Sequence, residues 1–341
     1  MRHRKMRGTI WVAGHNYVTS LPTKWGEKIK NEYNSQIEKL QLNDKIIITP
    51  PFDPFKKKVI TLKVDQKKTV KIKMNVISAY LQGYDIIELT SETPFSDDTI
   101  TFLNKRTIPG FYGELSSDRK CYRLIVTTLF EVEIPNLFNE IKSIIHQLSD
   151  YLQEYFKSFP RMNEIDKKCI NDLEHRLDEM NFHFMRFLNK SLSYADIFEK
   201  VGLEDDRSII HLNSAFLYIE RLGDLYTDIV KRLDKISKLK PSANLESFQT
   251  YYQHASEVLL TALNSLTDPY KGVEIIEGKA SKWKTYKDGV LIDAEKNIKQ
   301  TIYSESDPKV IREMTILEGK LYAIPDISSN ICEQLWNKKK I

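Results

Sequence analysis

Hydrophobic residues recur every three or four positions through most of the second half of the chain. In residues 206–239 the core candidates alternate at spacings of four and three, and residues 164–190 follow the same pattern. This period puts them on one side of an α-helix and predicts the core seams of an antiparallel bundle. Breaks at prolines divide the bundle into two halves of three helices. The predicted helices span residues 135–159, 164–190, 206–239, 244–265, 269–286 and onward, and 308–336.

Shorter apolar runs in the first 133 residues predict strands that alternate with helices. The predicted strands are 9–18, 46–49, 59–64, 70–74, 84–89 and 122–129, and helices follow Pro22 and span 76–82 and 96–105. Gly83, Gly110 and Gly113 are predicted turn residues. The chain is therefore predicted to be a multidomain α+β protein. Its parts are a β-rich head at 1–58, a small α/β connector at 59–133, and a bundle at 134–341 with repeats 134–240 and 241–341.

Composition and charge narrow the function. At roughly 100–200 residues per domain, 341 residues make two or three domains, and only 12 Gly and 12 Pro favour long helices. Residues 1–73 hold 17 Lys and Arg against 6 Asp and Glu, while the rest of the chain is net negative. A basic head on an acidic body suggests nucleic acid as its partner, although a solvated basic surface gives the same count.

Membrane, secreted and thiolate-metal classes are disfavoured. The chain has no apolar run of the 18 or so residues that a membrane span needs, and no export signal follows its basic start. Its three cysteines are isolated, which disfavours a zinc site or a disulfide framework. We therefore expect a cytoplasmic protein without membrane insertion.

The runs NYVTSLPTKW at residues 16–25 and LNDKIII at 42–48 resemble the SpoVT/AbrB family of DNA-binding domains. That resemblance implies a swapped-hairpin β-barrel homodimer that binds double-stranded DNA. Two departures stand out: Asn43 replaces the turn glycine, and residues 29–40 insert a polar helix before the second strand. The candidate DNA-binding residues are Arg2, Arg4, Lys5, Arg7, Asn16, Thr19, Ser20 and Lys24.

Two pairs of carboxylates lie beside the helical seams. Glu174 and Asp178 form one pair, and Glu220 and Asp224 form the other, with Asp228 one turn later. Residues four apart project from one helix face, so two such helices can assemble a hard-ligand site for iron, manganese, magnesium or calcium. The same spacing is also common on solvated helix surfaces.

Residues 218–229 (YIERLGDLYTDI) closely resemble a signature of the PhoU family, and residues 170–178 resemble the acidic helix that precedes it there. This implies a six-helix bundle of two three-helix repeats, a role in phosphate-uptake regulation, and metal sites on the acidic helices, with iron as the first candidate. In the second repeat Ser281 replaces an Asp and Tyr322 replaces a Glu. Only Glu277 and Asp326 remain there, so we expect one intact metal site and a last helix kinked at Pro325.

An AbrB-like head, an α/β connector and a PhoU-like bundle together resemble archaeal PhoU-domain regulators. The resemblance implies a DNA-binding transcriptional regulator of phosphate uptake and homeostasis whose bundle binds metal. The alternative is an adaptor that docks on a phosphate transporter or sensor kinase and uses its head only to dimerise. A ferritin-like di-metal enzyme needs Glu-x-x-His pairs, and none of the seven histidines follows that pattern, so no enzyme is expected. His175 and His183 are either further ligands or structural residues.

Overall fold

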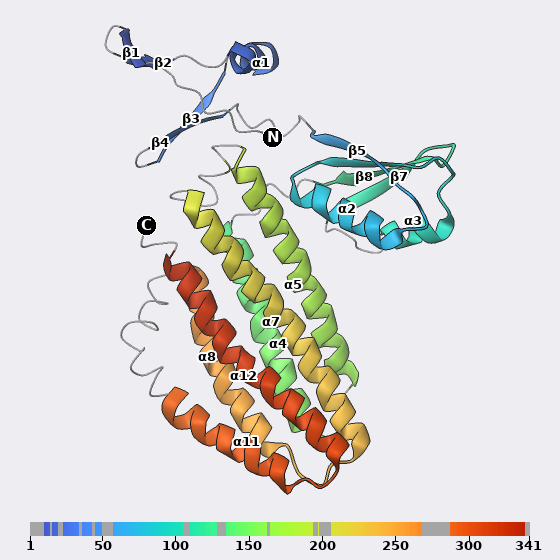
Figure 1. Cartoon of the computed structure of the whole chain (residues 1–341), viewed down its shortest axis with the longest axis vertical. Coiled ribbons are helices and arrows are strands. Elements are labelled where there is room, and N and C mark those ends of the chain that lie inside the picture. The colour runs from blue at the N-terminus through green and yellow to red at the C-terminus, as the bar shows by residue number, and fades with distance from the viewer. Residues whose placement is uncertain are drawn as a thin grey trace.

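The computed structural model describes most of the chain, and in the described residues the protein is a mixed α+β structure that is mostly helical (Figure 1). This confirms the predicted class. The described residues are 10–13, 16–19, 23–33, 36–42, 45–49, 57–104, 110–127, 134–161, 164–193, 197, 206–267 and 287–337.

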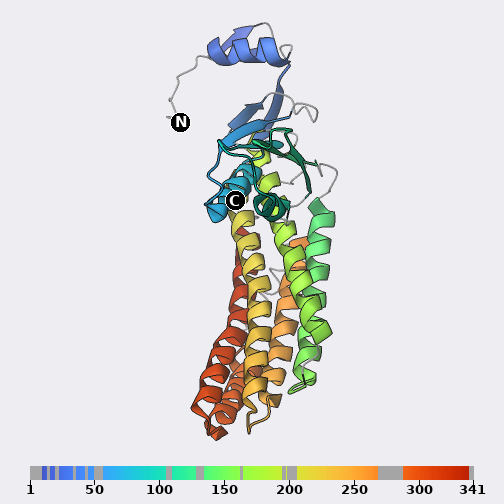
Figure 2. The same ribbon diagram turned by 90° about the vertical axis from the view of Figure 1, so that its right-hand side faces the viewer.

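Five long helices lie side by side and form the bundle (Figures 1 and 2). Their apolar stripes share one core, in which the rings of Phe184 and Phe216 stack with centroids 3.5 Å apart. Every predicted bundle helix within the described residues is confirmed to within two residues at each end. Residues 269–286 lie outside them. The helices are α4 (Ile134–Lys157), α5 (Glu164–Ser191), α7 (Asp206–Leu239), α8 (Glu246–Thr267) and α12 (Pro308–Asn337), with the π-helical turn η2 (Lys287–Leu291) and α11 (Ile292–Ser304) between the last two.

A four-stranded sheet with its own core precedes the bundle. Its strand order is β5 (Val59–Lys63), β6 (Ile86–Thr90), β8 (Cys121–Val126) and β7 (Phe111–Leu115). Strands β5 and β6 are parallel, so the chain must cross over between them, and α2 (Thr69–Leu81) makes that connection. Helix α3 (Asp97–Asn104) follows β6. Figure 2 shows this domain at one end of the bundle.

Two predictions in this domain are wrong. Residues 70–74 alternate apolar and basic side chains like a strand, yet they belong to α2, which also contains all but the last residue of the predicted helix 76–82. The buried positions of α2 fall three, four and seven apart, so packing on the sheet follows the helical period, while Val70 and Met74 are exposed. Gly113 lies inside β7 rather than in a turn, and the hydroxyl of Tyr122 occupies the space where a side chain would stand, which explains the glycine.

The head contains two antiparallel hairpins and a helix. Strands β1 (Ile10–Ala13) and β2 (Asn16–Thr19) pair with each other, so the single strand predicted at 9–18 is instead a hairpin. Helix α1 (Thr23–Tyr33) ends well before residue 40, where a longer polar helix was predicted. Strand β3 (Glu38–Leu42) follows and pairs with β4 (Lys45–Thr49), since its residues alternate in polarity.

No helix among the described residues is both long enough and apolar enough to cross a membrane. The bundle helices are amphipathic instead, with charged residues flanking each apolar stripe. Helix α12 remains helical on both sides of Pro325.

Candidate functional site

Helices α5 and α7 approach each other closely at Gly223. A Cβ atom added at this glycine would lie 3.0 Å from Cδ2 of Leu177 and 3.5 Å from Cγ of Glu174. A glycine inside a helix is unfavourable by about 1 kcal/mol relative to alanine, so the close contact accounts for its presence. The glycine thus brings the backbone of α7 against the side chain of Glu174.

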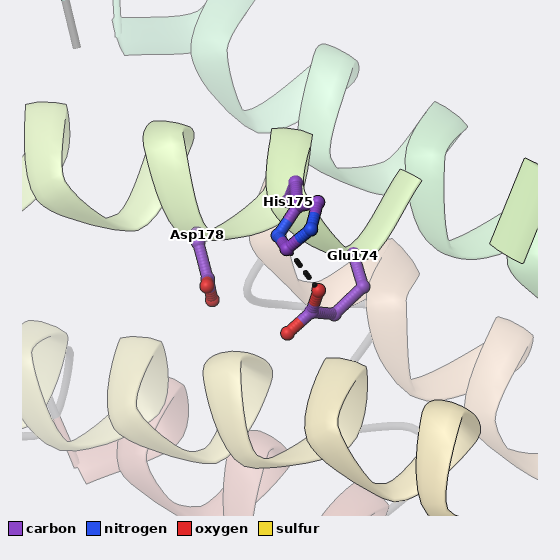
Figure 3. Close-up of side chains that lie close together, drawn as sticks. All are labelled: Glu174, His175 and Asp178. Atoms are coloured by element: carbon purple, nitrogen blue, oxygen red, sulfur yellow. Dashed lines mark ion pairs between the residues drawn. The ribbon is translucent and has the colours of Figure 1, made fainter. Parts of the chain in front are cut away.

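The first pair of acids projects from α5 toward this contact. Figure 3 shows the carboxylates of Glu174 and Asp178 pointing from α5 toward the neighbouring helix. With His175 they offer three ligand atoms that all lie within 4.8 Å of one another. Nδ1 of His175 is 3.2 Å from Oε2 of Glu174, whose side chain is only 13% exposed, whereas that of His175 is 70% exposed. The carboxylates are therefore sheltered, and the imidazole lies at the rim.

The second pair of acids, on α7, acts electrostatically on the first. Burial raises the pKa of Asp178 to about 6, with further contributions from the charges of Glu174 and Asp224. Burial also raises the pKa values of Glu174 and Glu220, and Asp224 adds to both. Glu174, Asp178, Glu220 and Asp224 therefore form one group across the two helices, which we call the acidic cluster.

The acidic cluster suits a hard cation. Within the part of the chain that the structure describes, no Lys or Arg forms an ion pair with any of its four carboxylates. Burying like charges together is unfavourable unless something neutralises them. Carboxylate oxygens are the ligands that iron, manganese, magnesium and calcium take in proteins, so these residues fit such an ion.

Asp228, the fifth predicted ligand, is held elsewhere. Its carboxylate lies 2.8 Å from Nζ of Lys320 on α12 and 3.6 Å from Nζ of Lys231. The hydrogen bond from Lys320 lowers the pKa of Asp228. Of the five predicted metal ligands, Glu174 and Asp178 lie at ligand distance from each other, Glu220 and Asp224 act on them electrostatically from α7, and Asp228 instead joins α7 to α12.

The corresponding region of the second half contains aromatic residues. Tyr322, at the position predicted to replace a glutamate, contacts the ring of Tyr251 with centroids 4.9 Å apart. Its hydroxyl donates a hydrogen bond of 2.7 Å to Glu318. Asp326 lies exposed on the same helix, and Glu277 and Ser281 lie outside the described residues.

The predicted DNA-binding residues are only partly described. Asn16 and Thr19 are the first and last residues of β2, and Lys24 is exposed in the first turn of α1. The other candidates lie outside the described residues: Arg2, Arg4, Lys5, Arg7 and Ser20.

A buried group of charges that the sequence did not predict joins α5 to the α/β domain. Oδ1 of Asp85 accepts hydrogen bonds from Arg186 at 2.7 Å and from Lys190 at 2.8 Å, and Oδ2 accepts one from the backbone N–H of Lys58. Arg186 also donates to two carbonyl oxygens of the α/β domain. We call Asp85, Arg186 and Lys190 the Asp85 cluster. Asp85 is more than 100 positions from both cations in the sequence, so no local pattern predicts their pairing.

His183 belongs to the same contact between α5 and the α/β domain. Its Nδ1 is hydrogen-bonded to the hydroxyl of Tyr80 on α2 at 2.9 Å. Burial lowers the pKa of His183 to about 4, and the charge of Arg186 adds to the effect. Of the two histidines considered as further ligands, only His175 lies with the acids.

Comparison with known proteins identifies no relative: no protein family model matches this chain, and no curated protein matches it. The chemistry of the acidic cluster therefore rests on its own geometry and charges.

Proposed function

We propose that this protein is a DNA-binding transcriptional regulator of phosphate uptake and homeostasis, acting as a homodimer whose helical bundle binds a metal ion. The acidic cluster carries the proposal, because the partly buried Glu174, Asp178 and Glu220 and the exposed Asp224 gather where α5 and α7 meet at Gly223, without a Lys or Arg ion pair among the described residues. The connection with phosphate rests on the resemblance of residues 170–178 and 218–229 to the PhoU family.

The ligands would be Glu174, Asp178, Glu220 and Asp224. Iron is the first candidate, and manganese, magnesium and calcium are the alternatives with the same preference for oxygen. The ion would supply the positive charge that this contact lacks. The four carboxylates would then hold α5 and α7 together instead of repelling each other.

Helix α5 offers a route from the bundle to the rest of the protein. It carries half of the acidic cluster, and about two turns later Arg186 and Lys190 bind Asp85 of the α/β domain. These buried bonds fix the α/β domain to α5. Any displacement of α5 relative to α7 would therefore move that domain, which precedes the bundle and follows the head in the chain.

The head supplies the proposed DNA contacts. Residues 1–73 carry an excess of 11 positive charges, and Lys24 is exposed on α1. Contacts between Lys or Arg and DNA phosphates release counterions, so binding falls steeply with salt. A protein with 6–10 phosphate contacts loses about 10³- to 10⁵-fold in affinity between 50 and 200 mM salt.

The test is fluorescence anisotropy of labelled duplex DNA with the full-length protein. Titrations at several salt concentrations, each with and without Mn²⁺ and inorganic phosphate, should show steep salt dependence and an affinity that changes with one of the two additives. Replacing Arg4, Lys5, Arg7 and Lys24 together by Ala should abolish binding. Lys299→Ala, which removes an exposed charge from α11, should leave it unchanged.

Two results would contradict the regulator. Absent or salt-insensitive DNA binding would leave the head as a dimerisation device and favour the adaptor for a transporter or sensor kinase. An equal loss of binding in the Lys299→Ala variant would show that total charge, rather than the head, determines the affinity.

A further inference from the structure

Asn181 on α5 has a buried oxygen without a partner. The residue is 9% exposed, and no described residue forms a hydrogen bond with its Oδ1. Nearly all buried polar atoms in proteins are hydrogen-bonded, so an exception of this kind needs an explanation. Asn213 on α7 is the other described residue with such an atom.

The helical period places Asn181 on the same side of α5 as the acids. It follows Glu174 by seven residues, which is almost two full turns, and Asp178 by three. The side that it shares with Glu174 faces α7, as the contact of Glu174 with Gly223 shows. The flank toward α4 is marked instead by Arg176, which pairs with Glu140 at 2.7 Å.

The packing of α5 on α7 determines which part of α7 lies opposite Asn181. The contact of Leu177 with Gly223 lies on one side of it along α5, and the stacked rings of Phe184 and Phe216 lie on the other. The antiparallel helices therefore bring Asn181 opposite the segment of α7 that contains Glu220. A buried, unpartnered carbonyl oxygen thus lies beside the acidic cluster.

We propose that Oδ1 of Asn181 is a neutral fifth ligand of a hard divalent cation held by the acidic cluster. This inference rests on the proposed metal-binding function. Hard cations take amide carbonyl oxygens together with carboxylates. A neutral oxygen extends the coordination without adding to the negative charge that the four acids already concentrate. It also accounts for an oxygen that no protein donor satisfies.

Asn213 provides the matched control. It is also an asparagine with a buried, unpartnered Oδ1, but it lies seven residues before Glu220, about 10 Å along α7 from the nearest acid, whereas Asn181 is only three residues from Asp178. Leucine has nearly the same shape as asparagine and no oxygen. Asn181→Leu and Asn213→Leu therefore make the same chemical change inside and outside the acidic cluster.

The experiment measures Mn²⁺ binding to the chelator-stripped full-length protein by calorimetry and by the electron paramagnetic resonance of the bound ion. Asn181→Leu should weaken Mn²⁺ affinity at least about tenfold, the loss typical of removing one group from a metal site's surroundings. Asn181→Asp, which keeps an oxygen there, should bind at least as tightly as wild type. Asn213→Leu should bind within about twofold of wild type.

Urea denaturation without metal separates ligation from packing. Both leucine variants should be at least as stable as wild type, because each replaces an unpartnered buried oxygen by an apolar group. If Asn181→Leu binds Mn²⁺ like wild type, or if Asn213→Leu loses as much affinity, the assignment of Asn181 is wrong while the acidic cluster stands. If wild type binds no Mn²⁺, the metal site and this ligand both fail. The Asn181→Asp variant retains the test should Asn181→Leu not fold.

Discussion

Helix α5 contributes residues to two groups of charged side chains, about two turns apart. Opposite charges neutralise each other in one group and like charges gather in the other. In the Asp85 cluster two cations meet one carboxylate, and all three side chains are at most 8% exposed and hydrogen-bonded. In the acidic cluster burial and neighbouring carboxylates raise the pKa values of Glu174, Asp178 and Glu220, and no described Lys or Arg forms an ion pair with the cluster. Neighbouring turns of one helix thus contain compensated and uncompensated charge.

The difference separates structural charge from charge that awaits a ligand. Buried ions are retained when partners satisfy them, and the Asp85 cluster accordingly fixes the α/β domain to the bundle. The acidic cluster has no Lys or Arg partner in the described residues, yet the close contact at Gly223 holds Glu174 against α7, the helix that carries Glu220 and Asp224. That unsatisfied negative charge distinguishes a candidate binding site from an interdomain bond.

The largest expected effect comes from breaking the compensated group. Asp85→Ala removes the carboxylate that binds the buried side chains of Arg186 and Lys190, and removing one partner of a buried ion pair costs about 3–5 kcal/mol. We expect a loss of this size in the free energy of unfolding, measured by urea denaturation at pH 7.

Asp97→Ala is the matched control. It also removes an aspartate paired with an arginine, Arg119, but the side chain of Asp97 is 88% exposed. Exposed pairs contribute about 0–1 kcal/mol. Equal losses in the two variants would show that the Asp85 cluster is no stronger than a surface pair.

Local sequence periodicity predicted the helices of the bundle and the acidic cluster, but not the Asp85 cluster. Both ends of α7 match the predicted span 206–239, because a long amphipathic helix repeats its apolar stripe many times. The spacing of Glu174 and Asp178, and of Glu220 and Asp224, likewise determines which side chains share a helix face. Which face meets which partner is a tertiary property, so neither the Asp85 cluster nor the separation of Asp228 from the acids was visible in the sequence.

The α/β domain shows where the same reasoning fails. The alternation of apolar and basic residues at 70–74 fits a strand as well as the exposed side of a helix, and five residues are too few to separate the two periods. The requirement for a crossover between parallel β5 and β6 decides in favour of α2, and that requirement appears only when the strand pairing is known.

The next prediction concerns the uncompensated group and pH. Asp178→Asn removes one of the four like charges, and in chelated protein it should raise the free energy of unfolding at pH 7 by on the order of 1 kcal/mol, a figure reduced because solvent screens this half-exposed carboxyl. The pKa of Asp178 is raised to about 6, so the folded state binds the extra proton below that pH. The contribution of Asp178 to the free energy of unfolding of wild type therefore falls as pH rises from about 4 to 6. The amount by which the variant exceeds wild type should grow over that range.

The free energy of unfolding of the variant must be compared with that of wild type at each pH, because His183 changes it with pH in the opposite direction. Its pKa is lowered to about 4, so the unfolded state binds the extra proton and stability falls as pH drops from about 6.5. That contribution is common to both proteins and cancels in their difference. Asp172→Asn, which makes the same chemical change at an exposed position of the same helix, is the control variant. If the difference in free energy of unfolding between Asp178→Asn and wild type stays constant from pH 4 to 7, Asp178 does not belong to the acidic cluster.

The two halves of the bundle extend the comparison. Where the first half brings four carboxylates together, the described part of the second half places Tyr322 against Tyr251 and binds its hydroxyl to Glu318. The sequence predicted that Tyr322 takes the place of a glutamate, but the aromatic contact depends on α8, a separate helix. A ring that fills the space and whose hydroxyl binds a nearby acid leaves less uncompensated charge there than in the acidic cluster.

The smallest expected effect tests the spacing on which the acidic cluster depends. Alanine in a helix interior is more favourable than glycine by about 0.8–1.0 kcal/mol, and at Gly319 on α12 nothing lies within 4 Å of an added Cβ. Gly319→Ala should therefore raise the free energy of unfolding by about that amount. At Gly223 the new methyl would lie 3.0 Å from Cδ2 of Leu177, which is buried and confined, so the same gain is offset by overpacking. We expect Gly223→Ala to gain at least about 0.5 kcal/mol less than Gly319→Ala in urea denaturation. Equal gains would mean that α5 and α7 have room to spare at Glu174, and the close contact would no longer explain why the four carboxylates stay together.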